Sequence, residues 1–200
     1  MHDVAWLAEN VCVADDFLSG SECAALIARS EALRYEAALV SKRSGPIIDV
    51  NIRNNDRVIL DDPMYASELW EKLRNIVPAT FHRIWHACGI NERLRFYRYE
   101  PGQYFDWHSD GSFWRSQREE SHFTFMVYLN EDCEGGETTF RGLPDHPHQD
   151  LVVTPKKGMA LIFRHPLWHR GSEVRHGRKY VLRSDIMYRL DPDSDEGVTG

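Results

Sequence analysis

The segment YFDWHSD, Tyr104–Asp110, decides how the rest of this 200-residue chain is interpreted. His108 and Asp110 stand two positions apart, so in an extended strand their side chains leave the same face. A neutral imidazole and a carboxylate that leave coordination positions free form half of a typical site for a redox-active divalent metal. A surface histidine beside a solvated aspartate gives the same pattern, so a metal site needs a further histidine from a distant strand.

Composition restricts the class of protein. Hydrophobic residues make up 42% of the chain and include six Trp, nine Phe and eight Tyr, which is ample for the core of one domain. The formal net charge of −7 argues against a general nucleic-acid or anionic-membrane binder. No apolar run reaches the roughly 18 residues of a membrane span, and the N-terminus lacks the basic region of a signal peptide. Four scattered cysteines without a CxxC spacing indicate reduced thiols in a cytoplasmic protein.

The first 92 residues mix helix and strand signals, which predicts a region that supports a larger sheet. Expected strands lie at 4–14, 37–40, 47–52 and 57–60. Ser21 and the Asp62-Pro63 pair are signals for a helix start, and Gly89 is a signal for a helix end. Three helices are therefore expected, at 21–33, 62–76 and 78–88.

From Arg93 onward the hydrophobic pattern changes to a period of two, which is typical of strands. Expected strands lie at 93–99, 103–108, 122–130, 137–140, 150–154, 159–163, 167–170 and 178–189. About eight short strands separated by turn residues predict a double-stranded β-helix of jelly-roll, cupin-like type, in a mainly β (α+β) fold with flanking N-terminal helices. We expect one domain over 1–190, with support at 1–92, the jelly-roll core at 93–189 and a frayed acidic tail at 191–200.

The distant histidine has two candidates in the segment FRHPLWHRG, which are His165 and His169. His165 precedes a proline, which favours an extended turn, whereas His169 lies in strand-like surroundings. Ten residues after His169 comes Lys179, in the strongly β-prone run KYVLRSDIMY. A basic residue on a neighbouring inward-facing strand suits a dicarboxylate cosubstrate, because the far carboxylate must be paired once it leaves water. Arg183, on the same strand face, is a rival for that carboxylate or a residue that binds the substrate.

Six linked segments give these residues a common context. They are YEPGQYFDWHSD, FTFMVYLN, EGGETTF, VTPKKGMALIF, HRGSEV and GRKYVLRSDIMY. In order and spacing, residues 93–189 resemble the prolyl 4-hydroxylase-like branch of the 2-oxoglutarate- and Fe(II)-dependent dioxygenases. The resemblance has two departures. The spacing between Gln103 and His108 is one residue longer than in several relatives, and Arg170 stands where relatives often carry Glu.

The resemblance implies roles for a set of residues. The implied iron ligands are His108, Asp110 and His169, and the implied partner of the 2-oxoglutarate C5 carboxylate is Lys179. Tyr99, Tyr128 and Thr138 are expected to line the cosubstrate pocket. Because the carboxylate of Asp110 is present, the resemblance implies a hydroxylase rather than a halogenase.

The implied activity is the hydroxylation of an unactivated C–H bond with O₂ and 2-oxoglutarate, which releases succinate and CO₂, with ascorbate as a reductant. The expected substrate is a prolyl or other side chain of a peptide, or a free amino acid or other small molecule. Two alternatives stay open. One is a cupin-like metal-dependent isomerase or dioxygenase, although such proteins usually carry His-x-His, a Glu and a later His. The other is a non-catalytic module that senses 2-oxoglutarate or metal.

Further residues near the expected pocket have two interpretations each. An inward-facing Arg95 indicates either an anionic substrate group or an ion pair with one of the many acids. Arg53 and Arg57 are expected to reach the same pocket mouth. Asp106 is either an orienting partner of a ligand or a solvated acid. The polar loop 111–121 is either a substrate lid or a solvated connection.

Overall fold

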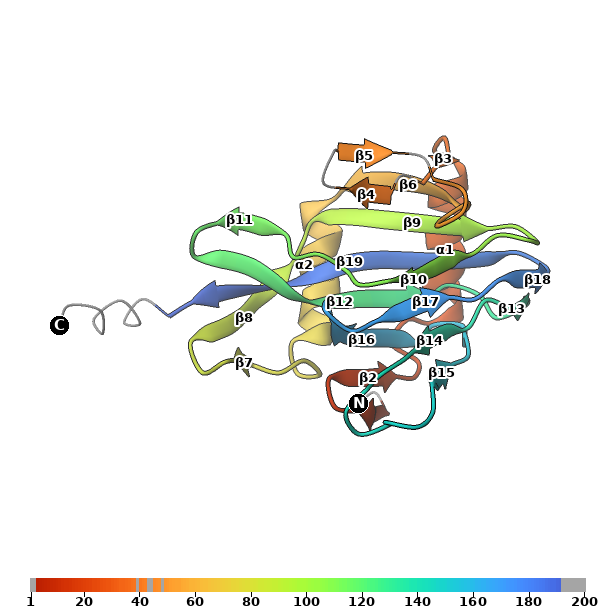
Figure 1. Cartoon of the computed structure of the whole chain (residues 1–200). Helices are drawn as coiled ribbons and strands as arrows, with labels where there is room; N and C mark the ends of the chain where they lie inside the picture. Colours follow the sequence, from red (N-terminus) through yellow and green to blue (C-terminus); the bar gives the residue numbers. More distant parts are fainter. Residues whose placement is uncertain (1–2, 39, 43–44, 48, 192–200) are drawn as a thin grey trace.

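The protein is built from two antiparallel sheets that face each other, with two helices behind the larger sheet (Figure 1). The computed structural model describes residues 3–38, 40–42, 45–47 and 49–191. The fold is mainly β and has the jelly-roll architecture that the sequence predicts. None of the helices within the described residues is long and apolar enough to cross a membrane. Apart from Asp191, the expected acidic tail lies outside the described residues.

The larger sheet is continuous from the N-terminal hairpin to the strands of the supporting region. Its order is β1 (Val4–Ala8), β2 (Val11–Ala14), β16 (Ala160–Arg164), β12 (Glu119–Tyr128), β19 (Lys179–Leu190), β9 (Arg93–Tyr99), β6 (Asp56–Asp61) and β3 (Glu36–Ala37). Three further strands extend it, with β8 (Trp85–Ile90) on β19, β7 (Thr80–Phe81) on β8 and β11 (Trp114–Ser116) on β12.

The smaller sheet covers part of the larger one and carries the segment with which the sequence analysis began. Its order is β10 (Phe105–His108), β17 (His169–Gly171), β14 (Thr138–Phe140) and β15 (Leu151–Val153). Two separate ribbons pair β13 (Glu134–Gly135) with β18 (Val174–His176), and β4 (Val40–Lys42) with β5 (Gly45–Ile47).

The two-residue period divides the larger sheet into two buried faces. On β12, Phe123 and Phe125 point to the helices, whereas Met126 and Tyr128 point to the smaller sheet. Both faces are covered, so every residue of β12 is buried or half-buried, including its polar ones. The face toward the smaller sheet is the one that holds the polar side chains discussed below.

The two helices, α1 (Gly20–Glu31) and α2 (Pro63–Leu73), pack on the outer face of the larger sheet (Figure 1). Ser19, not Ser21, caps α1, and it forms a capping box with Glu22. α2 starts as predicted, with Asp62 as the cap and proline in the first turn. Leu69 is fully buried, which contributes about 2 kcal/mol of apolar transfer free energy.

The prediction of a helix at 78–88 is wrong, because this segment forms the hairpin β7–β8. β9 pairs only with residues 179–183 of β19, so the half of β19 at 186–190 lacks a neighbour on that side. β8 supplies it, with Ile90 opposite Ile186. The hydrogen bonds of an otherwise open edge outweigh the weak helical signals of the segment. The tight turn places His82 and Arg83 at positive φ, 49° and 67°.

Other expected boundaries need smaller corrections. The strand expected at 4–14 is a hairpin, β1–β2, that turns at Asn10 with φ 65°. The segment expected as a strand at 47–52 contributes Ile47 to β5, whereas residues 50–52 form a turn and residue 48 lies outside the described residues. All eight strands expected after residue 93 are present with shifted ends, but the described residues contain nineteen strands, because short ribbons and the supporting region add the others.

Candidate metal centre

The smaller sheet brings the two predicted histidines together. β10 pairs with β17 so that His108 lies directly opposite His169, although 60 residues separate them in sequence. Asp110 follows β10, and one ligand atom from each of the three side chains lies within 4.8 Å of the others. The carboxylate oxygens of Asp110 lie 3.8 Å from Nε2 of His108 and 3.8 Å from Nε2 of His169.

Both imidazoles are oriented by backbone oxygens. Nδ1 of His108 lies 2.7 Å from the carbonyl oxygen of Asp106, and Nδ1 of His169 lies 2.9 Å from that of Leu167. A carbonyl oxygen only accepts, so each Nδ1 carries the hydrogen and each Nε2 presents a lone pair toward Asp110. Burial lowers the pKa of His108 to about 3 and also lowers the pKa of His169, so both rings are neutral at pH 7, as metal ligands must be.

The carboxylate of Asp110 is held in its ionised form. Burial by itself raises the pKa of Asp110, but the charge of Arg183 and the two histidines hold that pKa well below its ordinary value. Nη2 of Arg183 lies 3.1 Å from Oδ2 of Asp110, and the hydroxyl of Thr124 donates to the same oxygen at 2.6 Å. The donor set is therefore two neutral nitrogens and one carboxylate, which is the set that suits a non-heme Fe(II) centre with open coordination positions.

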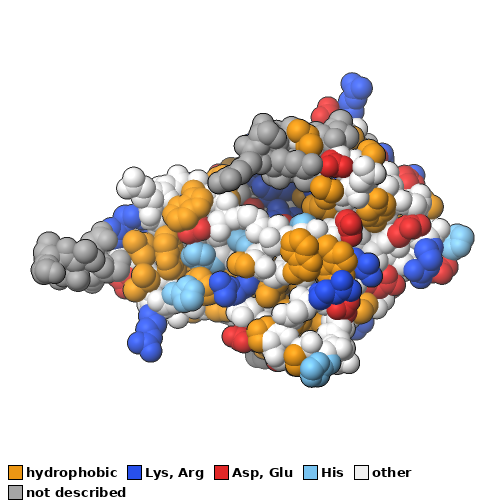
Figure 2. Space-filling view, viewed as in Figure 1, with side chains coloured by type: hydrophobic (Ala, Val, Ile, Leu, Met, Phe, Trp, Pro, Cys, Tyr) orange, Lys and Arg blue, Asp and Glu red, His pale blue; other side chains and the backbone are white. Residues whose placement is uncertain are grey.

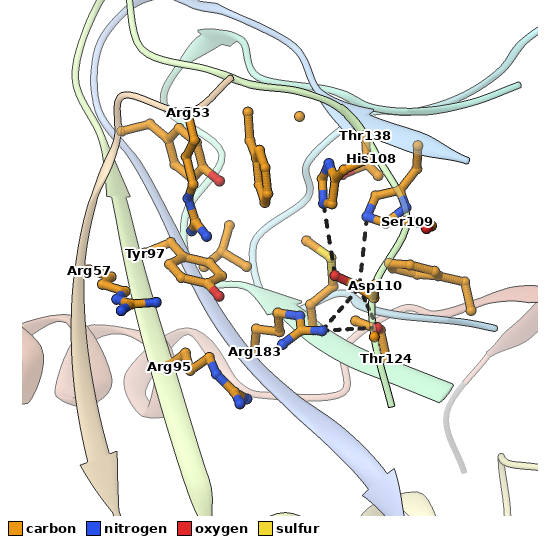
Figure 3. Close-up of a pocket in the computed structure, with 18 of the residues that line it drawn as sticks. Arg53, Arg57, Arg95, Tyr97, His108, Ser109, Asp110, Thr124, Thr138 and Arg183 are labelled. Atoms are coloured by element: carbon orange, nitrogen blue, oxygen red, sulfur yellow. Dashed lines mark hydrogen bonds and ion pairs between the residues drawn. The ribbon is translucent and has the colours of Figure 1, made fainter. Parts of the chain in front are cut away.

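A cavity of about 450 Å³ opens beside these three side chains (Figure 3). Its walls come from both sheets and from residues 52–57. Figure 2 shows basic side chains gathered in a hollow on the face that is viewed in Figure 1. The predicted residues Tyr99, Thr138, Lys179 and Arg183 line the cavity. Tyr128 lies behind the wall, where its hydroxyl is 2.6 Å from the hydroxyl of Thr138.

Lys179 is a buried cation in the wall of this cavity. Its side chain is 2% exposed, and its ammonium group donates to the carbonyl oxygen of Gly136. Nζ also lies 5.0 Å and 5.4 Å from the ring centres of Tyr99 and Tyr128, within the range of a cation–π contact. Among the described residues, no carboxylate lies within 4.0 Å of Nζ, and burial lowers the pKa of Lys179 to about 8. A dicarboxylate would provide the missing counter-charge.

The rival candidates lie elsewhere in the network. His165 is buried but remains outside the three-residue group, because its ring nitrogens face the hydroxyls of Ser121 and Thr124 at 2.9 Å and 3.0 Å. Arg183 is occupied by Asp110 and also contacts Asp185 at 3.2 Å. Arg95 forms the ion pair that was its plainer interpretation, at 3.0 Å from Asp185.

Local geometry describes two further predicted features and one departure from relatives, and a lid role for the loop 111–121 stays a prediction. The backbone of Asp106, not its exposed carboxylate, orients His108. The loop 111–121 contains β11, which pairs with β12. The side chain of Arg170 lies over the ring of Trp107, 4.9 Å from its centre, on the outer side of the smaller sheet.

Sequence reasoning missed the role of Phe105. Its ring stacks on His108, with centres 3.5 Å apart and planes at 13°. Three positions separate the two residues, so a regular strand would place them on opposite faces. The register shifts between Phe105 and His108, and this irregularity brings both rings to one side. The one residue more than in several relatives between the segment Gly102-Gln103-Tyr104 and His108 is consistent with this irregularity.

Comparisons with known proteins agree with this geometry. Residues 94–184 match the family model of the 2OG-Fe(II) oxygenase superfamily. The chain is 26% identical to prolyl 4-hydroxylase 1 of Arabidopsis thaliana over 200 residues, covering 88% of this chain and 68% of that protein. It is 35% identical to probable prolyl 4-hydroxylase 11 of the same plant over 101 residues, covering 48% of this chain and 34% of that protein.

A solved structure supports the fold. A Pseudomonas putida prolyl-4-hydroxylase superimposes with a TM-score of 0.66 at 18% identity, covering 88% of this chain and 92% of that chain. At this identity the likeness concerns the fold, whereas the family model and the plant relatives carry the sequence relationship. Residues 94–184 are therefore similar to the 2OG-Fe(II) oxygenase superfamily, and the chain resembles prolyl 4-hydroxylases of that superfamily in sequence and in fold.

Proposed function

We propose that this protein hydroxylates an unactivated C–H bond with O₂ and 2-oxoglutarate and releases succinate and CO₂. The substrate is a prolyl or other side chain of a peptide, or a free amino acid or small molecule. One observation carries the proposal: three metal-type donors meet in a cavity whose wall also holds a buried ammonium group, and no described carboxylate forms an ion pair with it. Ascorbate as a reductant and a cytoplasmic location stay predictions.

The proposed binding residues fit both absent groups. His108, Asp110 and His169 would hold Fe(II) through two nitrogens and one carboxylate, and Lys179 would pair with the far carboxylate of 2-oxoglutarate. When bound together, Fe(II) and 2-oxoglutarate supply the activation of O₂ that breaks a C–H bond. The protein supplies orientation, exclusion of water and electrostatics.

The chain's own residues prepare the site in three ways. The carbonyls of Asp106 and Leu167 keep Nε2 of each histidine free to bind. Arg183 keeps Asp110 ionised, so Asp110 can bind a metal ion without first losing a proton. The rings of Phe105 and other lining aromatics exclude water from the reacting region, which strengthens every charge interaction within it.

The test is succinate formation by the purified protein with Fe(II), 2-oxoglutarate, O₂ and ascorbate. His108→Ala should abolish both succinate formation and metal binding. His176→Ala is the matched control, because His176 is 80% exposed and lies at the end of β18, outside the proposed centre. Full turnover by His108→Ala would refute the ligand assignment, and a wild-type protein that binds 2-oxoglutarate without forming succinate would be a sensor.

A substrate screen completes the test. Free amino acids and proline-bearing peptides are offered to the loaded enzyme, and a mass gain of one oxygen is recorded for each. A gain in one class identifies whether the carbon that is hydroxylated belongs to a peptide or to a free molecule.

A further inference from the structure

One side of the cavity is rich in arginine. Arg53, Arg57 and Arg95 lie around Tyr97, and Asp110 and His108 lie on the opposite side (Figure 3). The lining contains five basic side chains and a single acid, Asp110. The basic ones are Arg53, Arg57, Arg95, Lys179 and Arg183. The cavity is therefore positive even though the chain has a net charge of −7.

Internal ion pairs account for only two of these cations. Arg183 meets Asp110 and Asp185, and Arg95 meets Asp185. Under the proposed function, Lys179 is neutralised by the cosubstrate. Two guanidinium groups remain, those of Arg53 and Arg57, and no carboxylate of the described residues lies within 4.0 Å of either.

Arg53 is built into the wall in one orientation. It is 4% exposed, its Nε donates to Oδ1 of Asn55 at 2.7 Å, and its guanidinium carbon lies 4.3 Å from the ring centres of both Tyr97 and Phe105. Its Nη2 atom is buried and has no hydrogen-bond partner among the residues that the structure describes. An unpaired nitrogen on a buried cation is unfavourable, so a fixed guanidinium of this kind is suited to a ligand that brings an anion.

The electrostatics of the neighbours point the same way. Burial by itself raises the pKa of Tyr97, but the charges of Arg53, Arg183 and Arg95 lower that pKa below its ordinary value. Burial lowers the pKa of Arg57, and the charges of Arg53 and Arg95 lower it further, against the opposing effects of Tyr97 and Glu36. Positive charge on this side is thus in excess of what the protein itself compensates.

The arginines also lie close to the reacting region. The ring of Phe105 separates the guanidinium of Arg53 from the imidazole of His108, because it contacts the first at 4.3 Å and stacks on the second at 3.5 Å. An anionic group bound by Arg53 would lie about one ring layer from the metal ligands. Arg57, which is half-buried, lines the same side nearer to solvent.

We propose that the substrate carries a carboxylate near the C–H bond that is hydroxylated, and that Arg53 and Arg57 bind this carboxylate. This inference rests on the proposed function and narrows its substrate class. The carboxylate comes either from a free amino acid or from an acidic residue of a peptide, and the test has one arm for each source.

The test measures binding without turnover, by calorimetry of the protein with Mn(II) and 2-oxoglutarate under nitrogen. The first arm compares free L-amino acids, L-proline among them, with their carboxamides. The second compares proline-bearing peptides that contain Glu with the same peptides containing Gln. In at least one of the two arms, the acid should bind at least about tenfold more tightly than its amide. This is the difference in affinity that a charge-assisted hydrogen bond implies.

Two variants assign the effect to residues. Arg57→Gln and Arg53→Gln should each weaken binding of the acid by about 10- to 100-fold and leave that of the amide little changed. Arg57→Lys should restore part of the loss, because it keeps the charge but not the two-pronged geometry. Arg57 is the primary site, because it is half-buried and its replacement disturbs folding less than that of Arg53. Arg74→Gln, an exposed arginine beside Glu71, is the matched control and should change nothing.

The outcomes separate the two proposals. Amides that bind as tightly as acids in both arms would overturn the carboxylate site, as would unchanged acid binding by Arg57→Gln. A loss of 2-oxoglutarate affinity as large as the loss of acid affinity would assign these arginines to the cosubstrate and overturn it too. If acids bind through Arg57 and no succinate is formed, the binding site stands and the proposed hydroxylase activity fails.

Discussion

Replacing Lys179 by methionine should make the metal-free protein more stable and its binding of 2-oxoglutarate weaker. Methionine keeps the length of the apolar stem between Tyr99 and Tyr128 and removes the charge. In the folded chain Lys179 is 2% exposed, and its ammonium group donates to the carbonyl oxygen of Gly136. A buried charge without a counter-charge opposes folding, and a bound dicarboxylate removes that penalty.

The magnitude follows from the pKa of Lys179, which burial lowers from 10.5 to about 8. At about 1.4 kcal/mol per unit, this difference corresponds to roughly 3 kcal/mol of destabilisation by the charged form at pH 7. The lost hydrogen bond to Gly136 offsets about 1 kcal/mol, so Lys179→Met should stabilise the metal-free protein by about 2 kcal/mol.

The gain should depend on pH. Between about pH 8 and 10.5 the unfolded chain binds a proton at Lys179 that the folded chain has released, so wild-type stability rises with pH in this window. The variant lacks this contribution, so its advantage should fall between pH 8 and 10.5, and above this range the lost hydrogen bond should leave it about 1 kcal/mol less stable than the wild type.

Urea unfolding of the metal-free proteins at pH 7 and pH 10 measures the effect, and calorimetry with Mn(II) measures 2-oxoglutarate affinity, which should fall at least about 30-fold. Lys156→Met is the matched control, because the side chain of Lys156 is 61% exposed and contacts Asp15 at the surface. The stability of this variant should differ from that of the wild type by less than about 0.5 kcal/mol. A Lys179→Met protein that is less stable at pH 7 and binds 2-oxoglutarate normally would refute the reasoning.

Three further substitutions test other parts of the site and core. Gly136→Ala should lower both stability and 2-oxoglutarate affinity, because the new Cβ would lie 2.9 Å from Cδ of Lys179. Gly142→Ala is the control, because Gly142 also has a positive φ but its Cβ would meet no atom within 4 Å. This control should lose only about 1 kcal/mol of stability. Equal effects of the two on affinity would contradict this contact. His122→Phe should add about 1 kcal/mol of stability at pH 5. Burial lowers the pKa of His122 to about 4, so wild-type stability is lost as pH falls from 6.5 toward 4; the shift corresponds to about 2 kcal/mol at pH 5, which is halved because the ring is only half-buried and partly screened by solvent. A parallel acid dependence in both proteins would disprove it. Arg183→Met should destabilise the protein by about 3 kcal/mol in urea unfolding and weaken metal binding, because it leaves a buried carboxylate without its cation; unchanged metal affinity would count against the role given to this arginine.

Strands buried on both faces were predictable from sequence, and a segment of mixed signals was not. β9, β12 and β19 have a strong two-residue period and lie close to their expected positions. The segment at 78–88 has no such signal, and its conformation depends on an open strand edge that is contributed by residues about 100 positions later. Local sequence carries no information about an edge formed so far away.

The candidate site also has a part that was predictable from sequence and a part that was not. The grouping of His108, Asp110 and His169 was predictable from residue type and spacing, and Lys179 lines the same cavity, whereas their roles toward iron and 2-oxoglutarate stay predictions. The stacking of Phe105 was not, because it depends on a bulge that breaks the strand period.

The sequence by itself determined which side chains of β9 and β19 face the cavity, since alternation along these two strands places Arg95, Lys179 and Arg183 on one face. Only the tertiary structure decided which of these cations are compensated. β19 pairs with β9 so that Arg183 lies opposite Arg95, and the two like charges share Asp185, while Arg183 also reaches Asp110 on the facing sheet. Lys179 lies opposite Tyr99, and no carboxylate within the described part of the chain forms an ion pair with it. Charge compensation depends on neighbours across strands and sheets, and register and packing set those neighbours, whereas the order of residues along one strand does not.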